Sequence, residues 1–66
     1  MKIKVNGEIK EIAAGSTVGD YMRSNNIPEN KTLVSVNDTV LTADEFDKTV
    51  LNDGDSLDLF TFAAGG

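Results

Sequence analysis

Residues 56–62, SLDLFTF, are the stretch that decides the fold of this chain. Polar and apolar side chains alternate along it and two phenylalanines raise its strand propensity, so it predicts a β-strand. Leu57 and Leu59 then point to one face of that strand. Phe60 and Phe62 point to the other. A small domain has room for one core, so we expect a helix to cover the leucine face and the phenylalanines to lie on the open side of a sheet.

Residues 2–12, KIKVNGEIKEI, predict an antiparallel hairpin. The Asn6-Gly7 dipeptide tolerates the positive φ angles of a two-residue turn, and the aliphatic side chains of KIKV share one face. The second strand is less regular, because Ile9 and Ile12 cannot both point inward without a bulge or a strand end between them. The register of this strand therefore stays open.

Residues 15–28, GSTVGDYMRSNNIP, contain the start and stop signals of one short helix. Thr17 is a suitable N-cap, and the carboxylate of Asp20 can reach back to it in a capping box. Pro28 bars continuation, so the helix is expected over about residues 18–26. Its apolar stripe consists of Val18, Tyr21 and Met22, with Ile27 closing the exit.

Residues 32–38, TLVSVND, predict a further strand in which Val34 and Val36 face inward. Residues 40–51, VLTADEFDKTVL, are interpreted as a compact connection to the last strand. Within it, Thr42 and Glu45 form a second capping-box pattern that favours one helical or 3₁₀ turn burying Phe46. The NDGD segment that follows is a turn signal.

The predicted order is strand, strand, helix, strand, short turn, strand and tail. One helix laid across a single mixed sheet is the simplest two-layer arrangement for so few residues. The first and last strands are expected side by side in the centre, as a parallel pair. This predicts an α+β domain of the β-grasp (ubiquitin-like) class, with about four to five strands packed on one short helix. The domain is expected over residues 1–62, followed by an extended, flexible Gly-Gly tail over residues 63–66.

Composition excludes several classes of function. The 66 residues include no cysteine and no histidine, which removes disulfides, thiolate or histidine metal sites and Ser-His or Cys-His catalysis. A formal charge of −5 is unfavourable for nucleic acid or a membrane surface. The N-terminal residues lack the apolar block of a signal peptide. We therefore expect a cytoplasmic protein, monomeric when free and complete as given, with a basic protein as partner.

The last four residues, Ala63, Ala64, Gly65 and Gly66, follow the predicted strand directly. Side chains this small suit a segment that threads a narrow channel, and glycine accepts conformations closed to other residues. The α-carboxylate of Gly66 is then the group of chemical interest. A carboxylate must be activated before a nucleophile attacks it, for example by adenylation with ATP. In this hypothesis the chain is the substrate of a partner enzyme that uses the ATP, and it binds no cofactor itself.

The motifs MKIKVNG, TVGD, VSVND, LNDGDSLDLF and terminal AAGG, taken in order over the whole chain, resemble the ThiS-type sulfur carriers of thiamine biosynthesis. The resemblance implies that a ubiquitin-activating-type adenylyltransferase adenylates Gly66. It also implies conversion to a thiocarboxylate with sulfur from a donor such as a cysteine desulfurase. Thiazole synthase, or another acceptor enzyme, would then take the sulfur, while Gly65, Ala64 and Ala63 thread the channel.

Other interpretations remain open. LFTF is also similar to the small subunit of molybdopterin synthase, which is usually longer, and other carriers of this build serve different pathways. A ubiquitin-like modifier would share the fold, the tail and the adenylation. An interaction module with an inert tail is a further alternative. Catalysis by the acidic clusters is disfavoured because no histidine or cysteine accompanies them. Ca²⁺ binding is disfavoured because DEFDKTVLNDGD lacks the spaced ligands and the central glycine of an EF-hand loop. These clusters are Asp44, Glu45 and Asp47, and Asp53, Asp55 and Asp58.

The docking surface is predicted at the end of the last strand. Exposed neighbouring aromatics are typical of an interface, so Phe60, Phe62 and Asp58 are expected to contact the partner. Asp53 and Asp55 are expected nearby, where they would steer a basic rim of the partner. The alternative is that Phe62 folds back over the sheet edge and stabilises the monomer.

Overall fold

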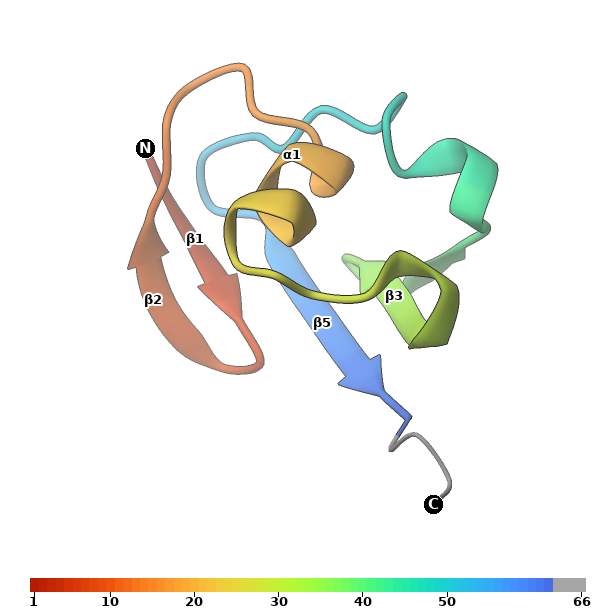
Figure 1. Cartoon of the computed structure of the whole chain (residues 1–66). Coiled ribbons are helices and arrows are strands. Elements are labelled where there is room, and N and C mark those ends of the chain that lie inside the picture. Colours follow the sequence, from red (N-terminus) through yellow and green to blue (C-terminus); the bar gives the residue numbers. More distant parts are fainter. Residues whose placement is uncertain (63–66) are drawn as a thin grey trace.

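In the computed structural model, which describes residues 1–62, the last strand lies in the middle of the sheet (Figure 1). The five strands have the order β2-β1-β5-β3-β4. β5 (Ser56–Thr61) runs parallel to β1 (Lys2–Val5) and antiparallel to β3 (Thr32–Val36). The parallel central pair is the arrangement predicted from the sequence, and the α+β class with the β-grasp arrangement is confirmed.

The N-terminal hairpin joins β1 to β2 (Glu8–Glu11) through Asn6 at φ 50° and Gly7 at φ 85°. Its register places Ile9 opposite Lys4, on the face of the sheet away from the helix, where Ile9 is exposed. β2 ends at Glu11, so Ile12 lies beyond the strand and packs against the core. The open question of register is thus answered: the two isoleucines do not both point inward, because Ile9 lies on the face away from the helix.

The helix α1 (Val18–Ser24) begins with the predicted capping box. The Asp20 N–H donates to Thr17 Oγ1 at 3.0 Å, and the Thr17 N–H donates to Asp20 Oδ2 at 3.0 Å. The prediction of a helix to residue 26 was wrong. Asn26 has a φ of 57° and the Ile27 N–H donates to the Met22 carbonyl at 2.8 Å, a Schellman-type stop that acts before Pro28.

The connection after β3 contains a strand that the sequence interpretation did not separate. Asn37 and Asp38 have φ values of 49° and 70°, and this turn leads into β4 (Thr39–Leu41), which pairs with β3. Residues 1–62 also contain two 3₁₀ turns: η1 (Glu29–Lys31) precedes β3, and η2 (Ala43–Glu45) follows β4. The second one buries Phe46, as predicted.

The core lies between α1 and the facing side of the sheet, as Figure 1 shows. Its buried side chains come from the helix, the sheet and the connections between them: Ile3, Val5, Val18, Met22, Val34, Phe46, Leu51 and Leu57. The opposite side of the sheet, which we call the open face, has no helix over it among residues 1–62. Within those residues there is also no helix of the length and apolarity that a membrane span requires.

Candidate functional site

β5 leads from the core to the predicted tail. Leu57, near the start of β5, is completely buried, whereas the last residues of β5 extend away from the core and lead to the C-terminus (Figure 1). The Phe62 N–H donates to the Lys31 carbonyl at 2.7 Å, and the hydroxyls of Thr61 and Thr32 are 3.1 Å apart. These contacts hold Thr61 and Phe62, the residues that precede the tail, against β3 and the end of η1. The tail itself, residues 63–66 with the predicted reactive Gly66, lies outside the described residues.

Phe60 and Phe62 form an aromatic pair at this end of the strand. Their ring centroids are 5.5 Å apart in an edge-to-face arrangement, with an interplanar angle of 68°. Phe60 is 63% and Phe62 is 54% exposed, so their predicted position on the open face is confirmed. Phe62 packs on Phe60 and still keeps half of its surface in solvent. Their role in docking stays a prediction.

The apolar surface around this pair is larger than the sequence interpretation indicated. Leu33 pairs with Phe60 across the β3–β5 ladder, and both it and Val40 on β4 are exposed. A shallow hollow of about 270 Å³ lies between these side chains. It is lined by Leu33, Ser35, Val40, Asp58, Leu59 and Phe60. We call Leu33, Val40, Phe60 and Phe62 the apolar patch. The alternation around Val34, which points inward, was the signal that places Leu33 on the open face.

Of the three acidic residues predicted near the docking surface, only Asp58 lies on the same part of the sheet. It pairs with Ser35 on β3 and is exposed beside the apolar patch. Asp53 and Asp55 precede β5 and lie at the opposite end of the strand, so the prediction that they flank the aromatics was wrong. An Asp55 oxygen accepts from the Asn52 N–H at 2.8 Å, and an Asp53 oxygen accepts from the Lys2 N–H at 2.8 Å. Both carboxylates stabilise the turn before the strand.

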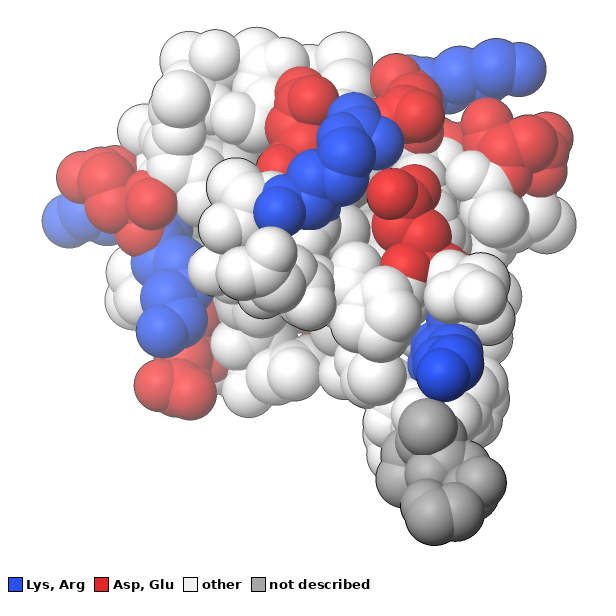
Figure 2. Space-filling view, in the orientation of Figure 1, with Lys and Arg blue, Asp and Glu red and all other residues white. Residues whose placement is uncertain are grey.

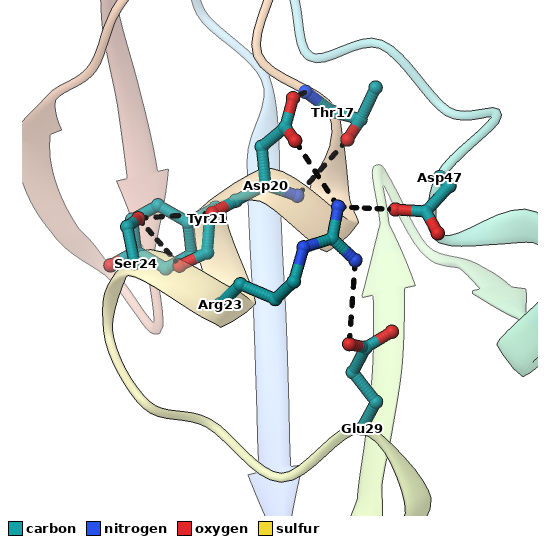
Figure 3. Close-up of polar contacts among 7 residues, drawn as sticks. All are labelled: Thr17, Asp20, Tyr21, Arg23, Ser24, Glu29 and Asp47. Atoms are coloured by element: carbon teal, nitrogen blue, oxygen red, sulfur yellow. Dashed lines mark hydrogen bonds and ion pairs between the residues drawn. The ribbon is translucent and has the colours of Figure 1, made fainter.

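The helix side of the molecule has a different character. Figure 2 shows acidic side chains gathered around basic ones over α1 and the adjoining connection. At the centre Arg23 contacts three carboxylates from separate segments (Figure 3). Its guanidinium nitrogens lie 2.7 Å from Asp47, 3.2 Å from Asp20 and 3.5 Å from Glu29. The hydrogen bond to Asp47 is the main reason that the pKa of Arg23 is raised.

The acidic cluster after β4 is likewise explained by local contacts. The Glu45 carboxylate accepts from the Thr42 N–H at 2.8 Å, and this bond is the main cause of the lowered pKa of Glu45. Asp47 belongs to the Arg23 contacts, and Asp44 accepts from the Thr42 hydroxyl. Within the described residues no group of three or more acidic side chains is arranged to hold a metal ion.

The comparisons with known proteins cover the chain from end to end. A model of the ThiS family matches residues 3–66. The crystal structure of a thiamine biosynthesis protein (ThiS) from Geobacter metallireducens has a TM-score of 0.84 and 28% identity, with 100% of both chains covered. The NMR solution structure of a thiamine biosynthesis protein from the same organism has a TM-score of 0.83 and 30% identity, covering 100% of this chain and 88% of that chain. No curated protein matches the chain significantly.

Proposed function

The chain belongs to the ThiS family, and from that premise we propose that it is a sulfur carrier of thiamine biosynthesis whose Gly66 carboxylate carries the sulfur. The observation that carries the proposal is the family match through residue 66, combined with the position of residue 62 at the exit of the central strand. The proposal takes Gly66 as the last residue of the mature chain. It places the chain in the cytoplasm, where ATP is available to the activating enzyme.

The chemistry belongs to the partner enzymes. A carboxylate oxygen of Gly66 attacks the α-phosphorus of ATP, forming an acyl-adenylate and expelling pyrophosphate. The outer sulfur of a donor persulfide, as on a cysteine desulfurase, then attacks the carbonyl carbon and displaces AMP, which gives an acyl disulfide. A thiol attacks the donor-side sulfur of this disulfide, so that a new disulfide forms and the thiocarboxylate leaves. This splits one difficult substitution into two easier ones. Thiazole synthase, as the acceptor, finally receives the sulfur.

The described residues contribute docking and presentation. In the proposal, the apolar patch contacts the ubiquitin-activating-type adenylyltransferase, and Asp58 meets a basic group at the rim of the contact. The exposed edge-to-face pair of Phe60 and Phe62 supports this assignment, since large aromatic side chains are favoured at the centres of interfaces. The short tail then needs to reach only from the edge of this contact into the active site.

ATP–pyrophosphate exchange by the cognate adenylyltransferase tests the proposal. We expect exchange with the native chain and none with a variant that has one residue added after Gly66 or with one that lacks Gly66. The fold of both variants is expected to be unchanged, because the core ends at β5. Circular dichroism and thermal melts provide the control for folding. Full exchange by the extended variant would contradict the role of Gly66.

A further inference from the structure

The two neighbours of β5 do not accompany it equally far. Pairing with β1 ends at Val5↔Leu57, whereas pairing with β3 continues to Thr32↔Thr61. The chain turns away at Asn6 to form the first hairpin, so the C-terminal half of β5 projects past that hairpin (Figure 1). One edge of this half is therefore paired with β3 and the other lies beyond the end of β1.

The direction of each main-chain group follows from the alternation of an antiparallel ladder. The Phe62 N–H donates to the Lys31 carbonyl, which makes residues 58, 60 and 62 the ones whose main-chain groups face β3. Leu59 and Thr61 consequently direct their N–H and C=O groups to the other side. The Leu59 N–H is bound there by the Asn6 side-chain oxygen at 2.8 Å. The Leu59 C=O and both main-chain groups of Thr61 point to where β1 would lie if it continued.

This segment also lacks the usual protection of a sheet edge. The outer edge strand β2 bears the charged residues Glu8, Lys10 and Glu11, which discourage pairing with another chain. Residues 59–61 are Leu, Phe and Thr, none of them charged. Thr61 is exposed, and the exposed Phe60 and Phe62 flank it on the open face. An added strand would find main-chain partners and an apolar contact at the same place.

We propose that a strand of the activating enzyme pairs with residues 59–61 on the side that faces away from β3, beyond the end of β1. The sheet would then continue into the partner. The inference rests on the proposed function and names how the partner binds. The occupant follows from continuity along the chain: Thr61 precedes Gly66 by only five residues, so an enzyme that receives Gly66 lies close to this segment. Pairing of main chains fixes the strand direction, and side chains of the added strand contact Phe60 and Phe62.

Thr61→Pro tests this pairing, with Thr61→Val as the matched control. Proline removes the N–H that faces the partner and leaves the ladder with β3 intact, because Thr61 makes no main-chain bond to β3. Valine keeps the N–H and loses the same hydroxyl contact with Thr32. In ATP–pyrophosphate exchange we expect the concentration for half-maximal rate to rise about tenfold or more for the proline variant, and to stay near the native value for valine.

Equal behaviour of the two variants, with exchange by the native chain intact, would overturn the pairing and leave the proposed function standing. Absence of exchange with the native chain would instead contradict the proposed function. Amide hydrogen exchange of the native chain provides a measurement independent of folding of the variants. The Thr61 amide is expected to be protected only with the adenylyltransferase bound. Protection that grows with the concentration of the chain alone would assign the edge to a second copy and overturn the proposal.

Discussion

The surface around Arg23 on the helix side differs from the surface at the end of β5 in how its groups are paired. On the helix side, charges from α1, η1 and the segment after η2 meet one another within the same molecule. At the end of β5, aromatic and aliphatic side chains face solvent, and main-chain groups of Thr61 point away from the ladder with β3. The charged groups of the first region find their partners within the chain. The exposed groups of the second region have the features of a binding surface.

The two regions should therefore respond differently to mutation. Exposed ion pairs such as those of Arg23 contribute little to stability and are screened by salt. Exposed aromatics likewise contribute little to the isolated fold, but they can dominate binding. The comparison predicts that residues of β5 separate cleanly into those that stabilise the core and those that bind, according to the face on which they lie.

Leu57→Ala gives the largest expected effect. Leu57 is completely buried at the centre of the sheet, so truncation leaves a cavity and costs about 2–5 kcal/mol of unfolding free energy. A domain of this size has about 3–10 kcal/mol in total, so much of the population is expected to unfold. Urea titration followed by circular dichroism measures this. A loss below 1 kcal/mol, on the order of a surface substitution, would break the distinction between the two faces.

Phe60→Ala, three residues further along the same strand, should show the reverse. We expect binding to the adenylyltransferase to weaken by about 2 kcal/mol, or roughly thirtyfold in Kd, with a nearly unchanged melting temperature. Calorimetric titration and a thermal melt on the same sample measure the two quantities. Lost stability with unaltered binding would show that the aromatic pair belongs to the monomer, and that another face docks.

The sequence predicted the central strands, the capping box and the outward phenylalanines because each depends on local pattern. It did not predict where α1 ends, since Pro28 was the visible stop signal whereas the left-handed conformation of Asn26 acts first. β4 was missed because it has three residues and an exposed Val40. The sequence interpretation placed Asp55 near Phe60. Their separation along the strand becomes clear only when the register and the ends of β5 are known.

Gly19 illustrates a tertiary reason that a pattern cannot supply. Inside a helix, glycine costs about 1 kcal/mol relative to alanine, so the sequence alone marks this position as a weakness. In the fold, a Cβ at residue 19 would lie 2.1 Å from an oxygen of Asp47, and the Gly19 N–H donates to the Phe46 carbonyl at 2.9 Å. The missing Cβ leaves room beside α1 for the Asp47 carboxylate, which accepts a hydrogen bond from Arg23.

Thr17→Ala tests the self-contained region with a smaller effect. Removing the cap hydroxyl leaves the Asp20 N–H without its acceptor and is expected to cost about 1 kcal/mol of unfolding free energy. Thr17→Ser keeps the oxygen and serves as the matched control. Binding to the adenylyltransferase should be the same for both variants. A binding defect specific to the alanine variant would show that the helix side also docks.

Acid titration gives the smallest expected effect. The pKa of Asp20 is lowered from its ordinary value of 3.8, mainly by the backbone hydrogen bond from Thr17, and the pKa of Glu45 is lowered from 4.5, mainly by that from Thr42. A folded pKa below the unfolded one means that this stabilisation is present above the ordinary values and is lost as pH falls below them. Asp20→Asn should flatten the fall in stability with acid. An unchanged slope would contradict the assignment.

The mass of the C-terminal peptide, measured on protein from its native cell, tests the central claim most directly. The account predicts a free chain in which one oxygen of the Gly66 carboxylate is replaced by sulfur. A chain extended by one residue and expressed in the same cell should lack this replacement. Only oxygen at Gly66, together with lysines of other proteins joined to Gly66 by an amide bond, would contradict the account and identify the chain as a modifier.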